Sequence, residues 1–347
     1  MIISLTLNPS VDYLYEIDSF QLGKLNRFKN PVRMVGGKGI NAGRTASILG
    51  SKVWATGVLA GKNGELVRSI LEKEKFSIDF LDIDGETRNA ITIMHNNGIQ
   101  TEMIEVGPYV KEKKKNTKTK KNKNKNKKKK KKDDTYINKT TKKKKKKKII
   151  QQNNISTNIE VICLCGSVNS KNENLYQNFI KIIKKKLGND IKILADISRT
   201  QLKNVLESDY KPYFIKPNIH EFSEIIDTVV NTKEEIVYHL KNSNLFDGVP
   251  LIIVSCGEDG AIAKFNKEIY DLKIPTIDLV NPTGSGDATV GGVAYALDNK
   301  LTTEEILRYA MASGVANAME EAVGFVDKKN VEDIKNKIII KKLIGGI

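Results

Sequence analysis

Short apolar runs alternate with helix-like patterns along most of this 347-residue chain. Runs that are predicted to be buried strands lie at 1–7, 53–59, 159–164, 191–195, 213–216 and 251–254. Apolar residues at helical spacing lie at 39–49, 65–75, 173–187, 199–207, 219–229 and 233–242. Parallel strands need a crossover between them, and a helix usually supplies it. The alternation therefore predicts an α/β fold with a mostly parallel central sheet and helices on both faces.

Two regions depart from this alternation. Alternating runs at 89–95 and 100–106 flank an Asn-Asn-Gly turn at 96–98, which predicts a hairpin in a small appended sheet. Runs at 261–265 and 268–272 are also strand-like and lead into a glycine-rich loop and a helix at 287–298. The last long helix is expected to begin at Thr302, with Glu305 completing a capping box.

One segment holds nearly all of the chain's net charge of +17. Residues 111–148 contain 23 of the 58 Lys and Arg and only three of the 41 Asp and Glu, which leaves 35 basic against 38 acidic residues elsewhere. Such a segment cannot bury enough apolar surface to fold, so we expect a disordered insert. It is either a tether for polyanions or a low-complexity expansion of A-rich lysine and asparagine codons. The nearly neutral remainder argues against a body that binds nucleic acid.

The insert also divides the chain. We expect 1–110 to form the N-terminal part of the core with the small appended sheet, 111–148 the insert, and 149–347 the remainder of the same core. The three cysteines are odd in number, and two lie in an apolar run, which indicates a reducing compartment rather than a disulfide framework. No run reaches the roughly 18 apolar residues of a membrane span, and the first residues resemble no signal peptide, so a cytoplasmic location is expected.

The segment Asn281–Asp287 (NPTGSGD) is the strongest chemical signal. Gly284 and Gly286 allow backbone N–H groups to converge at a helix start, where the helix dipole favours an anion. Such a site could hold the charge of a transferring phosphoryl group, with Asp287 accepting a proton from the attacking hydroxyl. The alternative is a glycine-rich turn in which Asp287 is only a helix N-cap.

Other segments are individually weaker. GGKGIN at 36–41 precedes a helix and offers a cation and an amide, or is a plain loop-to-helix junction. Asp12, Arg27 and Arg88 are candidates for ligand contacts or for surface charge. The segment 216–221 (KPNIHE) either supports a metal-bound phosphate chain or is a turn with a helix cap. The three histidines show no metal-ligand spacing.

The order of these motifs resembles the ribokinase/phosphofructokinase-B family of sugar kinases, in its branch of tagatose-6-phosphate kinases and 1-phosphofructokinases. The resemblance rests on LTLNPSVD at 5–12, GGKGIN at 36–41, ETRN at 86–89, TEMIEVGP at 101–108, GS at 166–167, DIS at 196–198, KPN and Glu221 at 216–221, VS with Gly257 and Gly260 at 254–260, and NPTGSGD at 281–287. It covers nearly the whole chain outside the insert. NPTGSGDATVGG is more similar to the version of the loop found in tagatose-6-phosphate kinases.

The resemblance implies a three-layer α/β/α ribokinase-like fold with a small β-sheet lid from about 11–35 and 88–106. It also implies that 149–347 is the nucleotide-binding part of the core. It implies Asp287 as the general base and Gly284, Ser285 and Gly286 as the anion hole. The residues implied for the sugar phosphate are Asp12, Gly37, Lys38, Asn41, Arg88 and Arg27. Those implied for the nucleotide are Lys216, Asn218, Glu221, Ser255, Gly257, Gly260 and Thr283. Asn218 and Glu221 would organise ATP and its Mg²⁺, with no direct protein metal site.

The leading hypothesis is an ATP-dependent kinase that converts tagatose 6-phosphate to the 1,6-bisphosphate, and the resemblance allows a homodimer through the lid. A 1-phosphofructokinase acting on fructose 1-phosphate is the rival within the family. One departure from the family pattern is Cys165–Asn169 (CGSVN), where a serine and a proline are lost. That departure and the lysine run motivate a third hypothesis, a catalytically lapsed protein that binds sugar phosphate or is tethered to RNA.

Overall fold

The computed structural model describes residues 1–96, 99–111 and 159–345. Every element below belongs to one compact unit made of 1–110 and 159–347. The predicted disorder of 111–148 falls, apart from Lys111, outside the described residues. In the described part of the chain, each helix is too short or too polar to cross a lipid bilayer.

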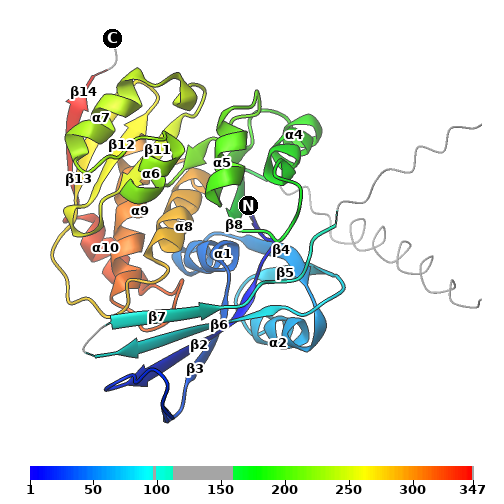
Figure 1. Ribbon diagram of the computed structural model, residues 1–347. Helices are drawn as coiled ribbons and strands as arrows, with labels where there is room; N and C mark the ends of the chain where they lie inside the picture. Colours follow the sequence, from blue (N-terminus) through cyan, green and yellow to red (C-terminus); the bar gives the residue numbers. More distant parts are fainter. Residues whose placement is uncertain (97–98, 112–158, 346–347) are drawn as a thin grey trace, which may run out of the picture. The chain divides into compact units, whose positions relative to one another are not determined.

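The centre of the unit is a ten-stranded sheet with the order β14-β13-β12-β11-β10-β9-β8-β1-β4-β5 (Figure 1). The strands from β5 to β11 in this order pair in parallel, whereas β12, β13 and β14 add antiparallel at one edge. Their bounds are β1 (Ile2–Thr6), β4 (Val53–Leu59), β5 (Ser77–Asp82), β8 (Val161–Gly166), β9 (Lys192–Ile197), β10 (Phe214–Ile215), β11 (Leu251–Ser255), β12 (Ala261–Phe265), β13 (Glu268–Lys273) and β14 (Ile339–Ile344). The mostly parallel sheet confirms the fold class that the alternation predicts.

Helices cover both faces of this sheet, so the architecture has three layers. One apolar cluster packs α1 (Lys38–Leu49), α2 (Gly61–Leu71), α8 (Ser285–Asp298), α9 (Thr303–Ala318) and α10 (Lys328–Lys335) against the sheet. The other packs α4 (Leu175–Leu187), α5 (Arg199–Leu206), α6 (Ile219–Ile225) and α7 (Lys233–Asn242). Each cluster takes alternate residues of the strands, because successive strand side chains point to opposite faces.

A second sheet of four strands has the order β3-β2-β6-β7 and is drawn as a separate layer in Figure 1. Its strands are β2 (Ser10–Ile17), β3 (Val32–Gly36), β6 (Arg88–His95) and β7 (Ile99–Ile104). β6 and β7 form the predicted antiparallel hairpin, and β2 joins β6 in parallel. This is the small lid-like sheet that the family resemblance implies.

Several local expectations were wrong in their bounds. The helix expected at 65–75 runs instead from Gly61 to Leu71, because its first turn is stabilised from elsewhere: the Asn63 N–H donates to Glu86 Oε1 over 2.5 Å. The helix expected at 219–229 ends at Ile225. β5, α10 and β14 were not predicted, and β14 is an edge strand whose lysines interrupt the apolar pattern.

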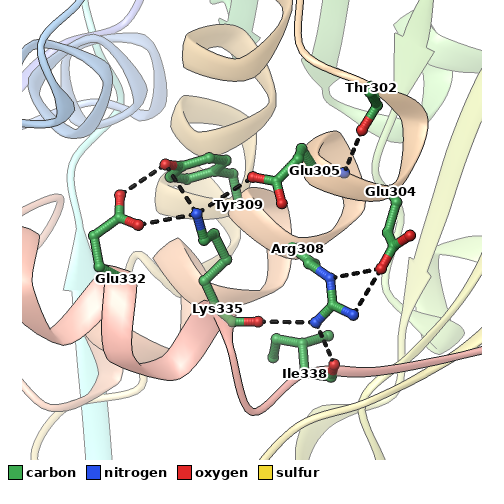
Figure 2. Close-up of polar contacts among 8 residues, drawn as sticks. All are labelled: Thr302, Glu304, Glu305, Arg308, Tyr309, Glu332, Lys335 and Ile338. Atoms are coloured by element: carbon green, nitrogen blue, oxygen red, sulfur yellow. Dashed lines mark hydrogen bonds and ion pairs between the residues drawn. The ribbon is translucent and has the colours of Figure 1, made fainter.

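The start of α9 shows half of the predicted capping box (Figure 2). Thr302 Oγ1 accepts a hydrogen bond from the Glu305 N–H, as predicted. The Glu305 carboxylate, however, forms an ion pair with Lys335 Nζ of α10 at 3.3 Å. Lys335 also contacts Glu332 at 2.9 Å, and Tyr309 donates to Glu332 over 2.7 Å. This cluster fastens α10 to α9, a helix that lines the cavity described next.

Candidate active site

The motifs converge where the parallel strands end, at the edge where α/β sheets usually bind ligands. A cavity of about 770 Å³ lies there. The predicted site residues that line it are Lys38, Lys216, Asn218, Glu221, Ser255, Gly257, Gly260, Gly284, Ser285, Gly286 and Asp287. They come from separate segments of the chain, so the fold brings together residues that the sequence could only align in order.

The N-terminus of α8 opens onto this cavity. Gly284 is the N-cap in a left-handed conformation with φ of +83°, which favours glycine, and a Cβ there would lie only 2.3 Å from Val323 Cγ1. The N–H groups of a first helical turn have no partner within the helix and can therefore meet an anion. In α8 one of them, the Ser285 N–H, donates to the Pro282 carbonyl over a long 3.3 Å. Asp287 lies inside the first turn of α8, which corrects the alternative in which it serves as the N-cap.

Asp287 is almost fully buried, with 8% of its surface exposed. The Asn41 Nδ2 donates a hydrogen bond to its Oδ2 over 2.9 Å. Burial raises the pKa of Asp287 to about 7, and the charge of Asp196 adds to this, whereas Lys38, Asn41 and Lys216 favour the ionised form. A carboxylate whose pKa lies close to neutral pH is suited to accept a proton.

Lys216 follows β10 and approaches the start of α8. A Cβ at Gly286 would lie 2.9 Å from Lys216 Nζ, so glycine at this position gives the ammonium room beside the helix start. Asn218 and Glu221 form a reciprocal capping box on α6: Asn218 Oδ1 accepts from the Glu221 N–H, and Glu221 Oε2 accepts from the Asn218 N–H. Asn218 and Glu221 therefore cap α6, as one of the two interpretations predicted, and they also line the cavity.

The far part of the cavity is less polar. Ser255 ends β11, and Gly257 and Gly260 bound the following turn. Apolar side chains that the sequence reasoning did not single out complete the wall, namely Ile274, Ile277, Leu279, Met311 and Val315. No local motif marks them, because they come from a loop and from α9. Such a wall suits a flat, largely apolar ring system.

A smaller cavity of about 230 Å³ adjoins the first, and Lys38 and Glu221 line both. Its other lining residues include Asn8, Arg88, Gly166, Ser167 and Ser198. Two cationic side chains on a small polar cavity suit an anionic group such as a phosphate ester.

Asp196 is a buried residue that the sequence analysis quoted only within a motif. It lies near the end of β9, lines the large cavity and pairs with Lys38 Nζ at 3.2 Å. Burial disfavours the charge on Lys38, but Asp196, Asp287 and Glu221 outweigh that effect, so the pKa of Lys38 is raised. Lys38 is therefore a fixed positive charge between the two cavities.

Five predicted residues line neither cavity. Asn41 touches Asp287 directly, and Gly37 is the N-cap of α1. Asp12 lies in β2, where burial raises its pKa and a hydrogen bond from Ser10 opposes that rise. Arg27 is exposed in the segment between β2 and β3, and Thr283 faces the lid, with its hydroxyl 3.4 Å from Gln100 Nε2. The structure therefore does not place Arg27 and Thr283 beside the other residues that the family resemblance implied for the site.

The altered turn at 165–169 keeps its place beside the site. Gly166 has φ of +92°, and Ser167 Oγ accepts a hydrogen bond from Asn8 Nδ2 over 3.1 Å. Asn169 Nδ2 donates to the Gly107 carbonyl just after the lid strand β7. The turn thus still lines the smaller cavity and contacts the segment that follows the lid, in spite of its departure from the family pattern.

The donor set fits a magnesium ion that remains bound to nucleotide phosphates. Within the described ranges, no group of three or more His, Cys, Asp or Glu side chains could hold a metal by itself. Asp196 and Glu221 do line the large cavity, and the buried Asp196 Oδ2 has no hydrogen-bond partner. Mg²⁺ in such sites typically takes one or two carboxylates together with phosphate oxygens and water.

Comparison with known proteins agrees with this geometry. The family model of pfkB carbohydrate kinases matches residues 5–130 and 99–328. A tagatose-6-phosphate kinase of Staphylococcus epidermidis is 34% identical over 97% of this chain and 98% of its own length. Phosphofructokinase-2 of Escherichia coli in complex with potassium has a TM-score of 0.75 at 20% identity, over 97% of this chain and 98% of that one. A tetrameric inhibited form of the same Escherichia coli protein gives a TM-score of 0.74 with the same coverage.

Proposed function

Because this chain belongs to the pfkB family of carbohydrate kinases, we propose that it transfers the γ-phosphoryl group of ATP to the C1 hydroxyl of tagatose 6-phosphate. The enzyme is an ATP-dependent sugar kinase by its family. The choice of sugar rests on its similarity to the staphylococcal tagatose-6-phosphate kinase along nearly the full length of both chains. The observation that carries the reaction type is the buried Asp287 beside the open N-terminus of α8.

In the proposed reaction, Asp287 takes the proton of the C1 hydroxyl while the hydroxyl oxygen attacks the γ-phosphorus of ATP. The bond from that phosphorus to the β–γ bridging oxygen breaks, and ADP leaves. The N–H groups at Gly284, Ser285 and Gly286, with Lys216 beside them, stabilise the charge on the transferring group. The positive end of the helix is already in place, so little reorganisation is needed in the transition state.

We assign the two cavities to the two substrates, the sugar phosphate and the nucleotide. The smaller cavity, with Lys38 and Arg88, would hold the phosphate already on the sugar. Asp12, Gly37 and Asn41 line neither cavity, and their proposed place near the sugar hydroxyls rests on the family resemblance. The larger cavity would hold the nucleotide, with its base against the apolar wall and with Asn218, Ser255, Gly257 and Gly260 around its phosphates and ribose. Mg²⁺ bound to those phosphates, near Asp196 and Glu221, would neutralise their charge.

A coupled ADP-release assay with ATP and Mg²⁺ tests this function. Tagatose 6-phosphate, fructose 1-phosphate and fructose 6-phosphate are compared side by side on the purified full chain. We expect the highest kcat/KM with tagatose 6-phosphate. A tenfold higher kcat/KM with fructose 1-phosphate would replace the proposed substrate, and folded protein without turnover on all three would support a lapsed, sugar-phosphate-binding protein.

The lid also suggests how copies of the chain associate. Large apolar side chains are exposed on or beside the small sheet, namely Leu22, Leu25, Ile99, Met103 and Val106. Exposed apolar surface of this kind commonly marks a protein interface. We therefore expect a homodimer through the lid, and light scattering on the intact protein and on a Leu25→Glu, Met103→Glu variant tests it. A monomeric parent protein would contradict the expectation.

A further inference from the structure

Arg44 of α1 is a buried arginine that no substrate could reach, since only 3% of its surface is exposed. All five of its N–H donors are used. Its Nε and Nη2 bind the two carboxylate oxygens of Glu74, each at 2.8 Å. Nη2 also donates to the Val35 carbonyl at the end of β3, and Nη1 donates to the Val323 carbonyl and, over 2.9 Å, to Asn41 Oδ1. The guanidinium is thus held from several sides in one orientation.

The contact with Asn41 determines which way its amide faces. An arginine can only donate hydrogen bonds, so the atom of Asn41 that faces Arg44 must be the carbonyl oxygen. The amide nitrogen then necessarily points the other way, where it donates to Asp287 Oδ2 over 2.9 Å. A flipped amide would place two acceptors, Asn41 Oδ1 and Asp287 Oδ2, against each other.

We propose that Arg44, clamped by Glu74, is a positioning residue for catalysis: it orients the Asn41 amide so that the amide holds the Asp287 carboxylate in place for proton transfer. This proposal deepens the function proposed above and rests on Asp287 as the base. The chain Glu74–Arg44–Asn41–Asp287 connects a segment after α2 to the cavity through three successive hydrogen-bonded contacts.

The chain of contacts Glu74–Arg44–Asn41–Asp287, called the relay from here on, affects proton transfer to Asp287. The hydrogen bond from Asn41 favours the ionised form of Asp287, together with the charges of Lys38 and Lys216, and against burial and the charge of Asp196. If Arg44 no longer fixes the amide, this hydrogen bond is weakened. The pKa of Asp287 then rises, and its carboxylate also has greater freedom to leave the line of proton transfer.

Lysine cannot replace Arg44 in this arrangement. It presents a single ammonium with three donors, which cannot bind both oxygens of Glu74 in parallel and also reach Asn41 Oδ1. Arg44→Lys therefore retains the charge but loses the fixed geometry. Since a small displacement of a reacting group can cost about 100-fold in rate, we expect kcat to fall by about 10- to 100-fold.

A double-mutant cycle separates positioning from mere packing. Arg44→Lys is compared in the parent protein and in an Asn41→Ala background. In the parent protein, we expect Arg44→Lys to lower kcat by about 10- to 100-fold and to move the acid limb of the kcat/KM profile upward by about one pH unit. In the Asn41→Ala background, the same substitution should change kcat by less than about twofold further. Equal losses in both backgrounds, or a normal kcat in folded Arg44→Lys, would overturn the relay.

Arg308→Lys is the matched control. Arg308 likewise uses several donors, on Glu304 and on the carbonyl oxygens of Lys335 and Ile338, but these partners all lie outside the chain of contacts to Asp287 (Figure 2). The substitution is expected to lower thermal stability without moving the pH profile. A pH profile displaced to the same extent in this control would refute the specific role of Arg44.

Two further measurements keep the test decisive. If Arg44→Lys does not fold, Glu74→Gln repeats the cycle, because it loosens the clamp while leaving Arg44 itself in place. The titration of the Asp287 carboxyl carbon, followed by NMR and assigned with Asp287→Asn, reports the relay without any substrate. An upward shift in the variant supports the relay even if none of the three sugars is phosphorylated, and an unchanged titration overturns it.

Discussion

Replacing Asp287 with asparagine should abolish most of the activity and at the same time stabilise the fold. The asparagine side chain is almost isosteric with aspartate and can still accept the hydrogen bond from Asn41, so substrate binding should change little. The amide cannot accept the proton of the attacking hydroxyl, however. We therefore expect kcat to fall by about 10²- to 10⁴-fold with little change in KM.

The effect on stability follows from the pKa of Asp287. Burial raises that pKa from its usual value of 3.8 to about 7, so between these values the folded protein binds a proton that the unfolded chain has lost. The ionisation of Asp287 therefore lowers stability progressively as pH rises through this window. At about 1.36 kcal/mol for each pKa unit, the cost approaches about 4 kcal/mol at about pH 8 and stays under about 2 kcal/mol at about pH 5.

Denaturant unfolding of both proteins at these two pH values tests this, beside steady-state kinetics. Asp287→Asn should be more stable than the parent, and the gain should be larger at the higher pH. Asp84→Asn, at an exposed turn, is the control and should change neither stability nor turnover. A near-normal kcat would remove Asp287 from the role of base, and a loss of stability at the higher pH would refute the argument from its burial.

Other changes test the neighbouring parts of the site and the fold. Asp196→Asn removes a like charge beside Asp287, so the acid limb of kcat/KM should move to lower pH; a limb that stays in place contradicts the electrostatic account. Arg88→Ala should mainly raise KM for the phosphorylated sugar, because in the proposed complex it contacts a phosphate that does not react, and a fallen kcat with unchanged KM would end that assignment. Thr302→Ala should cost about 1 kcal/mol in the free energy of unfolding with unchanged kinetics, since it removes only the N-cap of α9; unfolding titrations and the ADP-release assay check both halves.

Local patterns predicted the elements well where the signal was itself local. The helix at 233–242 has the predicted bounds, with Thr232 and Glu235 forming a capping box, and α1 ends at Leu49, as the pattern at 39–49 predicts. The start of α2 could not be predicted, because Glu86 supplies a partner for its first turn from outside the helix. The same holds for Glu305, whose carboxylate is engaged by Lys335 rather than by its own helix start.

For the site, sequence order identified most of the polar residues that line the two cavities. It did not show which cation faces which anion. Thr283 illustrates the difference: it stands within the NPTGSGD motif, yet its hydroxyl faces the lid strand β7. The backbone of the loop turns sharply at the left-handed Gly284, so neighbours in the motif point to different surroundings.

Local sequence patterns were enough to predict the layered α/β architecture, the glycine-rich helix start and the presence of a carboxylate within it. These depend on hydrophobic period and turn chemistry, which act over a few neighbouring residues. Long-range packing, by contrast, is what buries Asp287, places the Asn41 amide against it across 246 residues of chain, and puts Arg44 and Glu74 behind Asn41. The pKa of a carboxylate depends on the solvent and charges that packing places around it, and those come from strands and helices far apart in the sequence.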